Sequence, residues 1–95
     1  MLYVRSDSVV SRVIGGETLI VPIRRGVGDL ASIYSLNEIA TAIWSAIAEP
    51  RNKSEIVQGI EAEFDTAGAE VDADVTTFLQ EMRSAGLVNE LEDAA

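Results

Sequence analysis

The sequence of 95 residues contains no cysteine and no histidine. Without cysteine the chain has no disulfide, no thiol nucleophile and no iron–sulfur ligand, and the reducing cytoplasm is its expected location. Without histidine it lacks the base of a Ser-His-Asp arrangement and the commonest metal ligand. We therefore expect a protein that is not an enzyme.

Long apolar runs are also missing. The longest one, Ile39 to Ala48, is interrupted by Thr41 and Ser45, and it is about half of the ~20 residues that a membrane-spanning helix needs. Near the N-terminus, Arg5 and Asp7 interrupt the region where a signal peptide has its apolar core. We expect no contact with a membrane.

Basic residues are few, with 7 Lys and Arg against 16 Asp and Glu, which gives a formal net charge of −9. Residues 1–50 carry four arginines and five acids (−1), whereas residues 51–95 carry three basic residues and eleven acids (−8). Such a chain is repelled by phosphate, so nucleic acid is not an expected partner.

The remaining composition is that of a folded domain, with 47% hydrophobic and 24% charged residues. A chain of this length buries only roughly 60 to 65% of the surface that it exposes when unfolded, too little for two cores. We expect one domain over residues 1–95, with its core at about 7–89 and a frayed end at 90–95.

Alternating apolar positions predict two strands at residues 9–14 and 17–23, joined at Gly15-Gly16 in a hairpin. Pro22 has no N–H, so the second strand should finish there or turn that position away from a ladder partner. The glycine-containing stretch 24–29 is predicted to be a loop.

A third strand near residues 33–36 should lead directly into a helix, because Asn37 is a good helix cap and the apolar positions that follow have helical spacing. Asn52 and Glu55 form the pattern of a capping box for a second helix. The third helix should end at Gly86, after a connector at 65–69. The buried stripes of these two helices are Ile56, Ile60 and Phe64, and Val71, Val75, Phe78, Leu79 and Met82.

This order predicts an α+β fold: a small winged-helix-like domain with an N-terminal three-stranded antiparallel sheet followed by three helices. We expect Trp44 and Phe78 in the core and leave Leu79 open between the core and a groove. Glu70, Asp72 and Asp74 resemble a metal cluster, but alternate residues of a helix point in different directions. Carboxylates are also favoured in a first helical turn, so we predict no metal and no cofactor.

Several ordered fragments resemble the PqqD family over roughly residues 7 to 89, most specifically Leu-Asn-Glu leading to Ile-Trp. They are Gly16–Val21, Tyr34–Glu38, Ile43–Trp44, Glu55–Val57, Phe64, Asp74–Val75 and Phe78–Leu79. The resemblance implies a non-catalytic recognition element for ribosomally made, modified peptides. The leader segment of the precursor would dock as an added strand between the third strand and the third helix. It would be presented there to a modifying enzyme, often a radical SAM protein. In this chain the stretch from Arg24 to Ala31 is longer than the tight glycine turn of the family.

Physical chemistry makes this docking mode reasonable, because an edge strand has a row of unpaired backbone groups that an extended peptide can use. For backbone pairing, geometry and resemblance together point to Ile33, Tyr34 and Ser35. For the helical wall they point to Val75, Thr76, Leu79 and Arg83. The acids at positions 70, 72 and 74 favour an apolar leader with basic residues near them.

Three other functions compete with this interpretation. A DNA-binding winged helix would read with its third helix, which carries Asp72, Asp74 and Glu81 but only Arg83 as a cation. An acidic carrier domain would need a serine after an aspartate at a helix start, whereas Asp29 is followed by leucine. A structural subunit of a larger enzyme complex is the third alternative.

Overall fold

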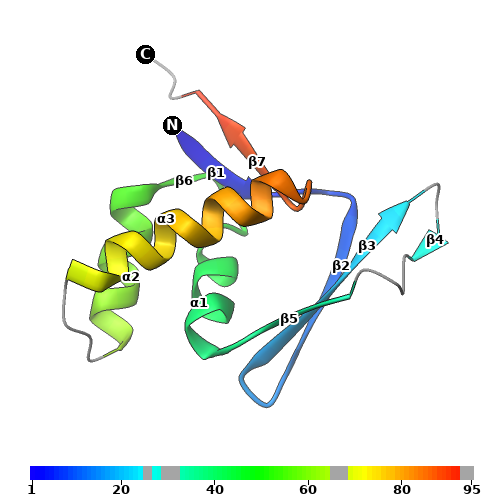
Figure 1. Ribbon diagram of the computed structural model, residues 1–95, viewed down its shortest axis with the longest axis horizontal. Coiled ribbons are helices and arrows are strands. Elements are labelled where there is room, and N and C mark those ends of the chain that lie inside the picture. Colours follow the sequence, from blue (N-terminus) through cyan, green and yellow to red (C-terminus); the bar gives the residue numbers. More distant parts are fainter. Residues whose placement is uncertain (25–26, 29–32, 65–68, 93–95) are drawn as a thin grey trace.

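The computed structural model describes residues 1–24, 27–28, 33–64 and 69–92. Within these ranges the chain forms three helices and two small antiparallel sheets, which confirms the α+β class (Figure 1). One sheet contains β2 (Val9–Ile14), β3 (Glu17–Arg24), β4 (Val27–Gly28) and β5 (Tyr34–Leu36). The other has the order β6 (Arg51–Asn52), β1 (Leu2–Arg5), β7 (Val88–Leu91). The helices are α1 (Glu38–Ala46), α2 (Lys53–Glu63) and α3 (Ala69–Ser84).

The predicted hairpin is confirmed. Gly15 and Gly16 have φ of 60° and 83°, the positive values that a two-residue turn of this kind requires. The β3 strand continues past Pro22 to Arg24, further than predicted. The N–H of Ile23 donates to the carbonyl of Ser8 at 2.7 Å, so by alternation the nitrogen of Pro22 faces the opposite edge of β3. At that edge neither β4 nor β5 pairs with Pro22, so the missing N–H of Pro22 costs no hydrogen bond of the sheet.

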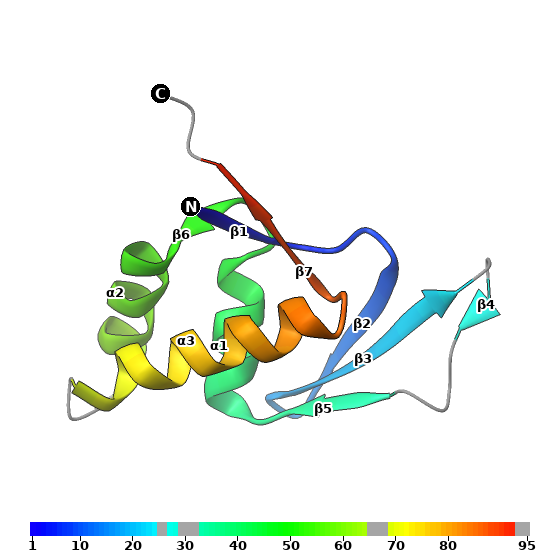
Figure 2. The ribbon, with the colours of Figure 1, turned by 45° about the horizontal axis from the view of Figure 1, so that its top comes forward.

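The sheet that joins the two ends of the chain was not predicted. Strand β1 pairs with β7 from Leu2↔Leu91 to Arg5↔Val88, and with β6 on its other side. Figure 2 shows these strands beside one another on the far side of the helices from the hairpin tip. The expected fraying of 90–95 is therefore wrong for Glu90 and Leu91, while 93–95 lie outside the described residues.

The expected loop and connector fall mostly on residues that are not described. Val27 and Gly28 form the short strand β4 against the end of β3, and residues 25–26 and 29–32 lie outside the described part. The same holds for 65–68, whereas Ala69 is the first residue of α3.

The helix boundaries follow from their caps. The Asn37 side chain accepts from the N–H of Ala40 at 2.9 Å, and Asn52 and Glu55 form both bonds of a capping box. Helix α3 ends in a Schellman motif. In it Gly86 has φ 78°, its N–H donates to the carbonyl of Arg83, and the N–H of Leu87 donates to the carbonyl of Met82.

Trp44 lies at the centre of the core, as predicted, and is 1% exposed. Its indole N–H donates to the hydroxyl of Ser11 at 3.2 Å. Arg5 lies over the ring at 5.0 Å from the centroid and donates to the Trp44 carbonyl at 2.8 Å. Partial burial lowers the pKa of the Arg5 guanidinium, which nevertheless stays charged. These contacts connect β1 to α1 and to the hairpin.

Candidate functional site

Strand β5 has one paired edge and one open edge. It pairs with β3 through Thr18↔Leu36, Leu19↔Ser35 and Ile20↔Tyr34. The bond from Ile23 to Ser8 sets the alternation along β3, so the backbone groups of Thr18 and Ile20 face β5. Their partners on β5 therefore face inward, and the N–H and C=O of Ser35 point outward. In the part of the chain that the structure describes, no strand pairs with this outer edge (Figure 1).

The open edge is held in place by side chains beneath it. The fully buried Thr18 donates its hydroxyl proton to the hydroxyl of Thr41 at 2.9 Å, and Thr41 donates to the carbonyl of Leu36 at 3.3 Å. Asn37, directly after β5, caps α1. This chain of bonds connects the end of β5 to both β3 and α1. The edge is therefore presented in a fixed orientation.

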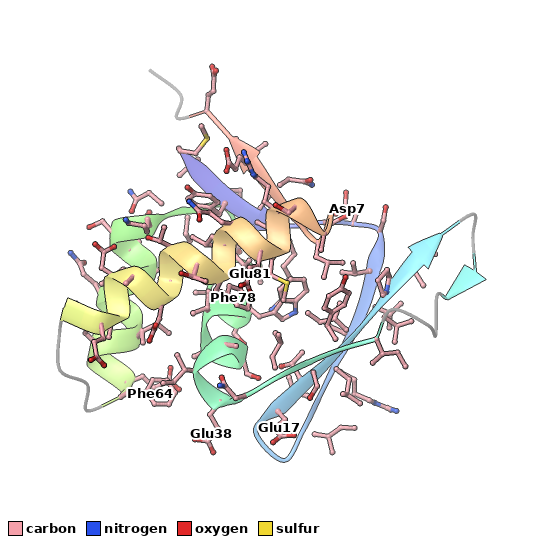
Figure 3. All side chains as sticks on the ribbon, in the orientation of Figure 1. Asp7, Glu17, Glu38, Phe64, Phe78 and Glu81 are labelled. Atoms are coloured by element: carbon pink, nitrogen blue, oxygen red, sulfur yellow. The ribbon has the colours of Figure 1, made fainter. Side chains whose placement is uncertain are left out.

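A cleft of about 350 Å³ opens where β5 passes into α1, between α1 and α3. Its residues are Asn37, Ile39, Ala40 and Ile43 from the α1 side and Asp74, Thr77, Phe78 and Glu81 from α3. Figure 3 labels Phe78 and Glu81 on the part of α3 that crosses α1. Four of the cleft residues are apolar, namely Ile39, Ala40, Ile43 and Phe78; Ile43 is buried and Ile39 is 36% exposed. The cleft therefore suits an apolar side chain of a bound molecule.

The three predicted residues of the strand lie together at the open edge. Ile33 is 49% exposed, Ser35 is exposed, and Tyr34 is half-buried and packed against the core. Because neighbouring residues of a strand alternate, Ile33 and Ser35 share the outward direction of the backbone groups while Tyr34 faces β3.

The four predicted residues of α3 do not meet at the β5 side of the helix. Val75 and Leu79 are 0% and 2% exposed and belong to the core, so they offer no free surface. Thr76 accepts from the Lys53 ammonium at 3.1 Å, and Arg83 pairs with Glu90 of β7 at 3.1 Å. Three of the four, Thr76, Leu79 and Arg83, line a hollow beside β1 and β7, away from β5.

The face of α3 that does line the cleft, Asp74, Thr77, Phe78 and Glu81, was not predicted as a wall. Leu79 is in the core, whereas Phe78 is only half-buried and borders the cleft, so the core assignment of Phe78 holds in part. The spacing 74, 77, 78, 81 is that of one helical face. The sequence contained this spacing, but it could not identify the wall. Phe78 and Leu79 are adjacent, large and apolar, so either could have faced the core.

The rim of the cleft is acidic. Asp72, which the sequence grouped with Asp74, pairs instead with Lys53 at 2.8 Å on the other side of α3. Among the described residues no ion pair involves Asp74 or Glu81. In the same part of the chain, no group of three or more His, Cys, Asp and Glu is placed to hold a metal ion. None of the described helices has the length and apolar character to cross a membrane.

An open strand edge beside an apolar cleft defines a module for binding an extended peptide by strand addition. The family model of coenzyme PQQ synthesis protein D (PqqD) matches residues 17–88, and the chain belongs to this family. Among solved structures, it is similar to the one described as TbiB1 in complex with the TbiA(beta) leader peptide. The TM-score is 0.77 with 28% sequence identity, over 95% of this chain and 99% of that one. No curated protein sequence matches the chain.

Proposed function

We propose that this protein binds the leader segment of a ribosomally made precursor peptide as an added strand on the outer edge of β5. In this proposal it presents the peptide to a modifying enzyme of the radical SAM type, in the cytoplasm, and performs no chemistry itself. The observation that carries the proposal is the unpaired outer edge of β5 at the mouth of the apolar cleft. Family membership and the similarity to a leader-peptide complex support it.

The residues that would meet the leader differ from those expected on α3. Backbone pairing would use the outward N–H and C=O of Ile33 and Ser35, with Tyr34 between them holding β5 to the core. The helical wall would be Asp74, Thr77, Phe78 and Glu81 in place of Val75, Thr76, Leu79 and Arg83.

The magnitudes suit a domain that both captures and releases a peptide. About four added backbone bonds at ~1 kcal/mol each and two or three apolar anchors at ~2 kcal/mol each give roughly 8 to 10 kcal/mol. Loss of rigid-body freedom and ordering of the peptide cost about 4 kcal/mol or more. The net gain is therefore at most about 4 to 6 kcal/mol, a dissociation constant of roughly 40 µM to 1 mM, which permits transfer to an enzyme.

The direct test is an amide NMR titration of the ¹⁵N-labelled protein with the leader of the precursor encoded beside its gene. We expect the largest shift changes at residues 33–36 and along 74–81. Changes confined to β1, β6 and β7, with residues 33–36 unmoved, would contradict the proposed site. A neighbouring gene for a radical SAM protein would support the proposed enzyme partner, and a different class of modifying enzyme there would refute that part alone.

A further inference from the structure

We infer that the α1–α3 cleft selects a guest strand whose large apolar side chain has lysine or arginine two residues away on one or both sides. This inference rests on the proposed function. It assigns the selection to Asp74 and Glu81, at the two ends of the apolar cleft wall on α3.

The spacing on α3 sets the pattern. Asp74 and Glu81 are seven residues apart, close to two helical turns, so they lie on the same face about 10.5 Å apart along the axis. Phe78 lies between them, opposite Ile39 and Ile43 of α1. Along α3, the cleft wall is therefore acidic at Asp74, apolar at Phe78 and acidic again at Glu81.

An extended guest presents a matching periodicity. Side chains at every second position of a strand point to the same face at intervals of about 6.6 to 6.8 Å. The residues two before and two after an anchor are about 13 Å apart. When the guest runs along α3 with its anchor against Phe78, long side chains at these positions can reach Asp74 and Glu81. Lysine and arginine suit these positions, because their aliphatic stems cover apolar surface while their charges reach the carboxylates.

The charge of these two acids is not compensated within the described residues. Lys53 is engaged by Asp72, and Arg83 by Glu90. Arg51 lies near Glu55 and donates to the carbonyl of Ala46. None of the basic residues that the structure describes lines the cleft, and the chain carries a formal net charge of −9. A guest with acidic flanks would meet repulsion at both ends, and one with basic flanks would be attracted before contact.

The test uses synthetic eleven-residue peptides with one central apolar anchor (Leu, Ile, Phe, Tyr or Trp) in a serine and threonine background. Positions two before and two after the anchor are both lysine, both glutamine or both glutamate. Fluorescence anisotropy gives the dissociation constant of each at 0.1 M and 1 M NaCl, between which the Debye length falls from about 10 Å to about 3 Å. We expect affinity in the order Lys, Gln, Glu, and a preference that shrinks at the higher salt concentration.

Variants assign the effect to residues. Asp74→Asn and Glu81→Gln should each weaken binding of the lysine peptide about two- to fivefold, as for a partly exposed ion pair, and leave the glutamine peptide unchanged. Glu61→Gln is the matched control, because Glu61 is an exposed acid of α2 that does not line the cleft.

The outcomes separate the inference from the proposed function. If the lysine, glutamine and glutamate peptides bind with equal affinity and shift the amides of residues 33–36, the charge selection is wrong and strand addition still stands. An equal loss of lysine preference in the Glu61→Gln control would assign the effect to net charge and would also overturn it. If no peptide moves the amides of 33–36 at millimolar concentration while the leader does, the inference fails and the proposed function stands. If the leader also leaves these amides unmoved, both fail.

Discussion

Replacing Ser35 with proline tests whether the guest pairs with the backbone of β5. The N–H of Ser35 points away from β3, so proline at this position removes no bond of the β3–β5 ladder. Proline is tolerated in an edge strand when its ring faces the open side. The Ser35 side chain is exposed and makes no hydrogen bond that the fold requires. The variant should therefore remain folded while it loses one donor at the proposed docking edge.

The magnitude follows from that one donor. A net hydrogen bond contributes about 0.5 to 1.5 kcal/mol, and a guest carbonyl left without a partner costs about 1 to 3 kcal/mol. The leader should therefore bind about five- to a hundredfold more weakly. Isothermal titration calorimetry with the leader measures the binding, and urea unfolding followed by Trp44 fluorescence confirms the fold.

Ser35→Ala is the matched control, since it removes the hydroxyl but keeps the N–H. It should bind as the wild type does. If Ser35→Pro is folded and binds with unchanged affinity, the guest does not pair with this edge. If Ser35→Ala loses as much as Ser35→Pro, the side chain is responsible and the backbone is not.

Four further variants separate the binding surface from the core. Phe78→Ala should weaken leader binding with a modest loss of stability. Leu79→Ala should instead lower the free energy of unfolding by about 2 to 5 kcal/mol, because Leu79 is 2% exposed. Both are measured by titration with the leader and by urea unfolding, and a larger stability loss in Phe78→Ala than in Leu79→Ala would contradict this assignment. Thr18→Val removes the donor to Thr41 and should cost about 1 kcal/mol in unfolding experiments, with faster hydrogen exchange along β5; unchanged exchange would show that this bond does not hold the strand. Asn52→Ala removes the α2 cap and should cost about 1 kcal/mol without changing leader affinity, because no residue of α2 lines the cleft. A large affinity loss would contradict a site formed by β5, α1 and α3.

Local signals in the sequence were sufficient for the elements that local chemistry determines. Two glycines between alternating runs determine the hairpin, and its register follows from the two-residue turn. Asn37, Asn52 and Gly86 mark helix ends through bonds to residues three to five positions away. The open edge of β5 was also predictable, because a strand that ends directly in a helix cap leaves little chain to cover it.

The second sheet depends on information that no local pattern contains. Its strands β1 and β7 have four residues each, and the pairing joins Leu2 to Leu91. A run of four residues at either end resembles a frayed terminus until a partner is known. The pairing brings Tyr3 to the side of α3 that carries Thr76 and Leu79.

That distant pairing also determines which face of α3 a guest would meet. Helix α3 packs against α2 and against β7, and its buried side chains are Val71, Val75, Leu79 and Met82. With these turned to the core, the neighbouring positions at Asp74, Phe78 and Glu81 border the cleft. Strands β1 and β7 do not line the cleft, yet their sheet determines the rotation of α3. The charge that the site presents therefore follows from tertiary packing, and helical periodicity alone could not distinguish Phe78 from Leu79.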